Sequence, residues 1–78
     1  MLVLKFIKSD ETGRHIDTSL SCETVEVIHC NDGFIITAYK TLIHKDGVEY
    51  RLSKNDNNSY RTCFVINEIG KTVDKYSV

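Results

Sequence analysis

Two Asp-Gly pairs, Asp32-Gly33 and Asp46-Gly47, constrain the fold of this chain more than any other feature. Both are flanked by β-branched and aromatic residues, and an Asp-Gly pair in such a setting is among the strongest local signals for a β-hairpin. Two hairpins that share the segment between them form a meander of three antiparallel strands. The stretch 31–52 therefore predicts a meander, which we expect at the centre of a small all-β domain.

The first Asp-Gly pair also predicts a strand register. A three-residue loop at 31–33, with Gly33 at positive φ, pairs Ile28 with Ile36. This register leaves large apolar groups on both faces of the hairpin, as in a strand that is covered on both sides. The face opposite Ile28 then carries Val25, Val27, His29, Ile35, Thr37 and Tyr39.

The second Asp-Gly pair predicts a tight turn. A two-residue turn at 46–47 pairs His44 with Glu49 and continues the preceding strand up to the turn. The following strand is apolar on one side only, so we expect it to have one buried face. The residues expected to face the core are Val48, Tyr50 and Leu52.

Alternation of apolar and polar residues predicts most of the remaining strands. The segment 24–30 has a helical alternative that begins at Cys22 or Glu23, but its β-branched residues favour a strand. Residues 15–20 alternate weakly and are expected to form a short edge strand or a loop. The other predicted strands are 2–8, 60–68 and 72–78, the last two joined by a turn at Ile69-Gly70.

Two polar segments interrupt this alternation. Residues 9–14 are expected to form a turn, and residues 53–59 a mobile surface loop. The prediction is a single domain, 1–78, of about six antiparallel strands, or seven, with little or no helix. Such strands either close on themselves or leave edges exposed, so we expect an SH3-like or partly open barrel, or a curved sheet.

An apolar surface patch is a further expectation. Val3, Ile7, Ile35 and Tyr39 are predicted to lie together, opposite the core face. A contiguous patch of this kind marks a partner or a dimer interface unless a barrel wraps it away. We therefore expect a homodimer or a higher homo-oligomer as one outcome.

Composition excludes several classes of function. The formal charge is −1, with acidic and basic residues mixed along the chain, so general DNA binding is disfavoured. No apolar run is long enough to cross a bilayer and no secretory signal is recognisable, so we expect no membrane partner and a cytoplasmic location. Free thiols are expected at Cys22, Cys30 and Cys63, because an odd number cannot pair within one chain.

No catalytic or metal-binding motif is present in the sequence. There is no Cys-x-x-Cys, no His-x-His and no Gly-x-Ser-x-Gly, and the adjacent His29 and Cys30 would point to opposite faces of a strand. Convergence of the three cysteines with a histidine at a zinc ion is kept as a minor alternative. We expect no enzyme activity, no cofactor and no metal.

Candidate ligand-binding residues are aromatic and basic side chains on the predicted strands. Rings with basic neighbours can stack a base and hold a phosphate, although tyrosine is also an ordinary strand residue. The candidates for contact with a ligand or partner are Tyr39, Lys40, His44, Arg51, Tyr60 and Arg61.

Three functional hypotheses follow. The preferred one is a non-catalytic protein that binds stoichiometrically to another protein or a nucleotide-like ligand. The absence of proline and the abundance of Lys, Ile and Asn are typical of phage and mobile-element products, so such a protein would inhibit a host or defence protein, or sequester a ligand, in the host cytoplasm. The alternative is a nucleotide- or nucleic-acid-binding β-barrel that uses Tyr39, Tyr50, Tyr60, Arg51 and Arg61. A small enzyme is the third hypothesis.

Overall fold

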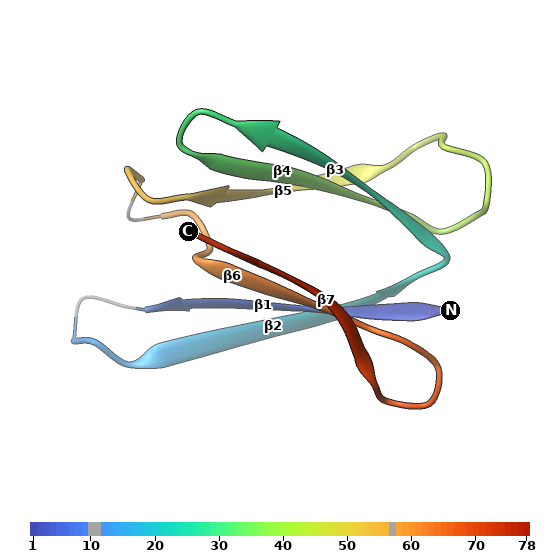
Figure 1. Cartoon of the computed structure of the whole chain (residues 1–78), viewed down its shortest axis with the longest axis horizontal. Helices are drawn as coiled ribbons and strands as arrows, with labels where there is room; N and C mark the ends of the chain where they lie inside the picture. Colours follow the sequence, from blue (N-terminus) through green and yellow to red (C-terminus); the bar gives the residue numbers. More distant parts are fainter. Residues whose placement is uncertain (10–11, 57) are drawn as a thin grey trace.

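The chain folds into two antiparallel β-sheets (Figure 1). The computed structural model describes residues 1–9, 12–56 and 58–78, with the side chain of Ser9 excepted. Within these residues there is no helix, and hence none that could cross a membrane. The seven strands are β1 (Leu2–Ser9), β2 (His15–Cys22), β3 (Thr24–Cys30), β4 (Gly33–Tyr39), β5 (Val48–Ser53), β6 (Thr62–Ile66) and β7 (Thr72–Ser77).

The two sheets differ in how far apart in the sequence their paired strands lie. The three-stranded sheet has the order β3-β4-β5, which is the meander predicted from the two Asp-Gly pairs. The four-stranded sheet has the order β2-β1-β6-β7, so β1 pairs with a strand more than fifty positions away, for example Leu4 with Val65. The all-β, antiparallel prediction is confirmed. The sheets do not close into a barrel, although a parallel bridge joins Leu52 to Tyr60 between them.

The chain crosses between the sheets at Glu23, which alone separates β2 from β3. The inner faces of the two sheets then lie against each other (Figure 1). Alternation places one residue in two of each strand on this inner face. The buried hydrophobic core consists of Leu4, Phe6, Cys22, Ile36, Ala38, Leu52, Cys63 and Val65.

Aromatic contacts join the two layers. Phe6 of β1 is fully buried, and its ring stacks on Tyr50 of β5 with a centroid distance of 4.6 Å. Tyr60 lies against the same ring at 5.1 Å. Phe34 of β4 contacts Tyr76 of β7 at 5.4 Å. Truncating a buried phenylalanine of this kind typically costs about 3–5 kcal/mol, so these rings contribute a large share of the stability of so small a domain.

The expected three-residue loop at the first Asp-Gly pair is wrong. Cys30 pairs with Gly33 and Ile28 with Ile35, so the turn has two residues, Asn31 and Asp32. The register therefore shifts by one, which moves each side chain of β4 to the other face relative to β3. Val25, Val27 and His29 consequently share the inner face with Ala38, Ile36 and Phe34.

Gly33 is required for close approach and not for positive φ. Its φ lies outside the positive region, and it pairs with Ser53 at the start of β4. A Cβ atom at this position would lie 1.9 Å from the carbonyl oxygen of Leu52. The glycine therefore allows the backbones of β4 and β5 to meet.

The expected two-residue turn at 46–47 is also wrong. β4 ends at Tyr39 and β5 begins at Val48, with Ala38 paired with Val48, so residues 40–47 form a longer connection. The positive φ in this connection belongs to Asp46, at 58°, a conformation that Asp tolerates better than most residues. The inward orientation of Leu52 and Tyr50 is confirmed, whereas Val48 is largely exposed.

The expected apolar patch does not form as a single surface. Val3 and Ile7 alternate with the buried residues of β1 and lie on the outer face of the four-stranded sheet. Ile35 and Tyr39 alternate with the buried Ile36 and lie on the outer face of the three-stranded sheet. Because these are opposite surfaces of the two-layer structure, the four side chains cannot make one patch.

The remaining segments agree with the sequence in part. The weakly alternating stretch forms β2, and residues 24–30 form β3 as predicted. The expected turn at 9–14 includes positions 10 and 11, and the expected loop at 53–59 includes position 57, all outside the described residues. In the described part of the latter segment, Lys54 N donates to the carbonyl of Asp32, and Ser59 is buried beside Asp56.

We expect Gly33→Ala to destabilise the protein by about 1–3 kcal/mol, because the added methyl group forces β4 away from Leu52. The measurement is urea unfolding followed by circular dichroism. The control is Gly70→Asn, where φ is 83° and a Cβ would meet no atom within 4 Å. Asn tolerates this conformation, so its effect should be under about 1 kcal/mol. Equal stability of Gly33→Ala and the parent would contradict the close approach.

Candidate functional site

The connection between β4 and β5, here called the 40–47 loop, has a defined shape although it lacks regular secondary structure. The carbonyl oxygen of Ile43 accepts hydrogen bonds from the Lys45 amide at 2.8 Å and from the Thr41 hydroxyl at 2.9 Å. These two bonds form a tight turn at the tip of the loop, within residues 41–45. Asp46 at positive φ then turns the chain back into β5.

A ring contact attaches this loop to the sheet. The imidazole of His44 lies parallel to the ring of Tyr39, with a centroid distance of 4.4 Å and an interplanar angle of 1°. His44 Nδ1 is also 3.6 Å from a carboxylate oxygen of Glu26 on β3. Gly47 lies close to Tyr39 as well, since a Cβ there would be 2.5 Å from the ring and from Thr37. The loop therefore closes around Tyr39.

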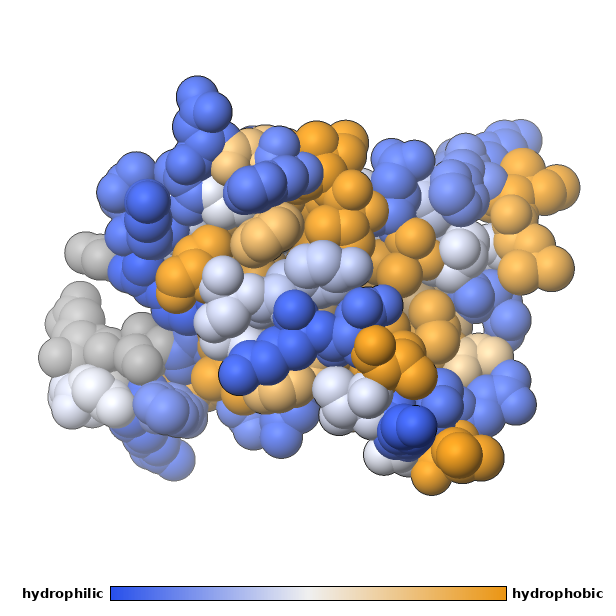
Figure 2. Space-filling view, in the orientation of Figure 1, coloured by the Kyte–Doolittle hydropathy of each residue, from blue (hydrophilic) through white to orange (hydrophobic). Residues whose placement is uncertain are grey.

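The tip of the loop carries two large apolar side chains that the core does not use. Leu42 is 80% exposed and Ile43 is 72% exposed. Figure 2 shows hydrophobic surface at this end of the molecule, at the upper right of the view, where Figure 1 places the connection between β4 and β5. Lys40 and Lys45, both exposed, lie on either side of the apolar pair in the chain.

The structure brings some of the predicted site residues together. Tyr39, Lys40 and His44 all belong to this loop or its base, and Tyr39 contacts His44 directly. Arg51 is exposed on the same outer face of the three-stranded sheet, opposite Ile35. Tyr39, His44 and Arg51 thus lie on this face, with Arg51 further along it, and Lys40 follows Tyr39 at the start of the loop.

The other two predicted residues lie beside the second half of β5, where the amide of Tyr60 donates to the carbonyl of Arg51 at 3.2 Å. Tyr60 packs its ring on Phe6, and its hydroxyl donates to the hydroxyl of Thr18 at 3.4 Å. The Lys8 ammonium is 5.4 Å from the centre of the same ring. Arg61 is half-buried, and its backbone bonds to Ile7 through the amide. The predicted residues therefore fall into two groups, one of Arg51, Tyr60 and Arg61 beside β5 and one of Tyr39, Lys40 and His44 at the 40–47 loop.

Leu42 and Ile43 are the residues that sequence reasoning missed. A continuous strand through residues 41–45 placed them opposite Arg51 and Tyr50, within the sheet. One signal was available, because two adjacent large apolar residues in a strand point to opposite faces and one of them needs a separate cover. Glu26 was likewise missed, because its contact with His44 depends on the fold of the loop.

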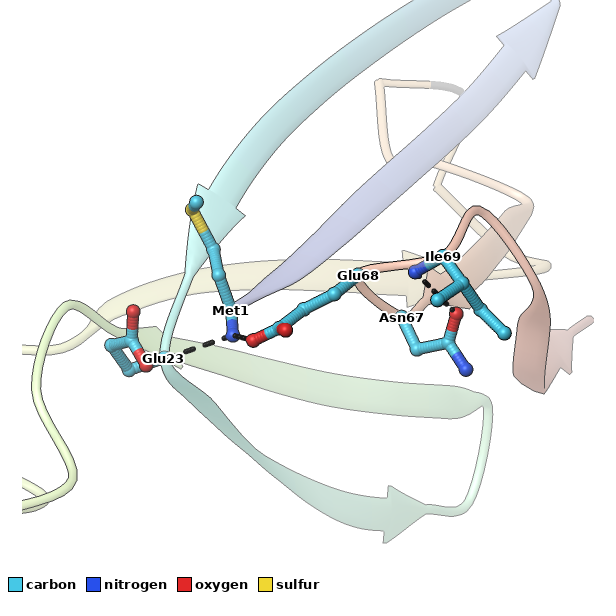
Figure 3. A network of polar contacts seen from close by, with 5 residues as sticks. All are labelled: Met1, Glu23, Asn67, Glu68 and Ile69. Carbon is cyan, nitrogen blue, oxygen red and sulfur yellow. Dashed lines mark hydrogen bonds and ion pairs between the residues drawn. The ribbon is translucent and has the colours of Figure 1, made fainter.

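A second feature lies at the amino terminus (Figure 3). The amine of Met1 donates to the Glu68 carboxylate at 2.6 Å and is 3.8 Å from Glu23. The hydrogen bond to Glu68 raises the pKa of the amine, and the same bond lowers the pKa of Glu68. Beside it is an open hollow of about 360 Å³ lined by Met1, Leu2, Asn67, Glu68 and Ile69. The charged groups here pair with each other, so the hollow offers a ligand no unpaired charge among these residues.

The three cysteines are free thiols. Burial raises the pKa of Cys63 to about 12 and also raises that of Cys22, so both favour the neutral thiol at neutral pH. Neither has the lowered pKa of a nucleophilic cysteine. Within the ranges that the structure describes, no three His, Cys, Asp or Glu side chains are grouped to hold a metal ion.

Comparison with known proteins leaves the site to be interpreted from its own geometry. Comparisons with protein-family models, curated proteins and solved structures find no match for this chain.

We expect alkylation of the native protein at neutral pH to modify Cys30 first. Cys30 is half-buried at the end of β3, whereas Cys22 and Cys63 are buried with a raised pKa and present little thiolate. Mass spectrometry after brief treatment with iodoacetamide measures the order of modification. The Cys30→Ser variant should resist the reagent until it is unfolded, and rapid modification of Cys63 would contradict the burial of that thiol.

We expect His44→Ala to loosen the 40–47 loop without unfolding the sheets. The substitution removes the stack on Tyr39 and the contact with Glu26, so the Lys45 amide should exchange with deuterium faster. Amides of β1 and β6 should keep their protection. His15→Ala, at an exposed position of β2, serves as the control and should leave the exchange of Lys45 unchanged.

Proposed function

We propose that this protein is a non-catalytic binding module that recognises another protein through the 40–47 loop. The observation that carries the proposal is the exposure of Leu42 and Ile43 at the tip of a loop that several contacts hold in shape. A protein that acts in this way occupies a surface of its partner in a fixed ratio. A stoichiometric inhibitor and a sequestering protein both work by this means.

The order within the loop supports this proposal. A flexible loop loses side-chain and backbone entropy when it binds, and that loss reduces affinity. Here the hydrogen bonds to the Ile43 carbonyl and the stack of His44 on Tyr39 already restrict the loop in the free protein. Exposed apolar side chains on a preorganised support are suited to insertion into a pocket of a partner.

The residues beside the tip indicate the chemistry of the partner surface. Lys40 and Lys45 place positive charge at both ends of the apolar pair, and Asp46 follows them. An apolar pocket with carboxylates on its rim would complement this arrangement. The apolar insertion would supply most of the affinity, and the exposed charges would mainly guide the approach.

The nucleotide-binding alternative has less structural support. The rings of Tyr50 and Tyr60 pack on Phe6, and that of Tyr39 on His44, so each ring already has an aromatic neighbour. Arg61 is half-buried and lies near Arg51, because the amide of the adjacent Tyr60 donates to the carbonyl of Arg51. The two arginines therefore lie beside a tyrosine whose ring already packs on Phe6, which disfavours stacking of a base there.

The decisive experiment is quantitative capture from the cells that produce the protein, with the immobilised parent and a Leu42→Ser, Ile43→Ser double variant compared. The expected result is a partner retained by the parent and reduced at least tenfold on the double variant, in both low and moderate salt. Removal of two exposed apolar side chains should leave the thermal unfolding of the protein almost unchanged.

The matched control is Ile69→Ser. Ile69 is 85% exposed but lies in the turn between β6 and β7, so it tests whether any exposed apolar residue has the same effect. This variant should retain the partner. Equal capture by all three proteins would refute recognition through the loop. Binding that falls steeply with salt, or a nucleotide-sized mass found on the native protein, would favour the nucleotide alternative.

A further inference from the structure

The open architecture leaves four strand edges, and they are not equally protected. β2 and β7 are the edges of the four-stranded sheet, and β3 and β5 those of the three-stranded sheet (Figure 1). An unpaired edge presents backbone amides and carbonyls that can pair with another strand. Natural proteins protect such edges with charged residues, bulges, short strands or covering segments.

Three of the four edges carry such protection. The bridge to Tyr60 covers the end of β5, where Tyr60 bonds to Arg51 and Ser53 through the backbone. β7 contains a register shift, because Val73 is an extra residue opposite Val65 and Ile66, and it carries Asp74 and Lys75 in its middle. β3 carries the carboxylate of Glu26 near its centre, and the 40–47 loop lies against this strand through the contact of His44 with Glu26 at 3.6 Å.

Among the described residues, no register shift interrupts β2 and no segment other than β1 pairs with it. It is an eight-residue strand with a regular register to β1 and with no proline, lysine or arginine. Its carboxylate, Asp17, is paired with Lys5 of β1 at 3.5 Å. Its inner face includes the apolar side chains of Ile16, which is 38% exposed, and Leu20, which is half-buried.

We propose that β2 pairs with β2 of a second copy of this chain, antiparallel and with Thr18 at the two-fold axis, so that two four-stranded sheets become one continuous sheet. A two-fold axis perpendicular to the sheet keeps each residue on its own face. Because Thr18 lies opposite Thr18, any two residues that face each other across the axis have numbers that add up to 36.

This register is complementary along the whole strand. Ile16 lies opposite Leu20 of the second copy, which covers both apolar side chains, and Asp17 lies opposite Ser19. Such cross-strand pairs are the unit of sheet stabilisation. A shift that places Asp17 at the axis would set two carboxylates against each other, and a shift that places Ser19 there would separate Ile16 from Leu20.

The same symmetry argument excludes β7. The central position of a two-fold pair is occupied by the same residue from both copies. At the middle of β7 this would place Asp74 against Asp74, or Lys75 against Lys75. Like charges directly opposite one another destabilise a strand pair, so the second copy is expected at β2.

The proposal is independent of the 40–47 loop, which emerges from the three-stranded sheet. Each copy in the dimer would keep its loop available, so a dimer would present two binding loops. Loss of self-association would therefore leave recognition through Leu42 and Ile43 in place, and loss of that recognition would leave the dimer in place.

Opposite charges at position 19 test both the edge and the register. Ser19→Asp places a carboxylate opposite Asp17 of the other copy, and this happens twice, once on each side of the axis. The variant should raise the dimer dissociation constant about tenfold or more. Ser19→Lys places an ammonium opposite the same carboxylate and should leave the dimer intact or tighten it. Sedimentation over a range of concentrations measures both, with the parent as reference.

The fold of each variant can be separated from its association. Ser19 lies beside Lys5 within the chain, so Ser19→Asp should not reduce the stability of the monomer, whereas Ser19→Lys should reduce it slightly. The control is Ser77→Asp, on the outer face of the β7 edge, and it should leave the dimer unchanged. A parent that is monomeric at all concentrations would overturn the proposal, as would equal effects of Ser19→Asp and Ser19→Lys.

Discussion

The contact of Phe6 with Tyr50 and Tyr60 is the interaction on which the two-layer structure depends. Phe6 comes from the first strand, Tyr50 from the fifth, and Tyr60 from the segment between the two sheets. A chain of this length buries a limited share of its surface, so a few large rings carry much of the hydrophobic stabilisation. Rings from three separate parts of the chain therefore hold the two layers together.

The aromatic core also decides which tyrosines remain for recognition. Tyr50 and Tyr60 face Phe6, and Tyr76 faces Phe34, so three of the four tyrosines contribute to packing. Tyr39 lies on the outer face and supports the 40–47 loop through His44. The sheets thus provide a rigid base, and the loop presents the apolar side chains that we propose to bind a partner.

The features of the fold that could be predicted are those that residues close together in the sequence determine. Alternation and turn residues located the strands and the β3-β4-β5 meander, because these signals act between near neighbours. The registers depended on single residues. Gly33 serves the approach of β4 to Leu52, and Asp46 takes the positive φ that was expected of a glycine. The candidate site was predicted in part, at Tyr39, Lys40 and His44, whereas Leu42 and Ile43 were assigned to a strand.

The sequence by itself determined that the chain is all-β, that its strands are short and antiparallel, and that its three cysteines cannot all pair with one another. These properties follow from side-chain periodicity and composition. Tertiary structure decided that β1 pairs with β6, that the strands divide into two sheets, and that Leu42 and Ile43 face solvent. No local signal specifies the pairing of β1 with β6 or the division into two sheets, because both depend on which distant side chains fill the core together.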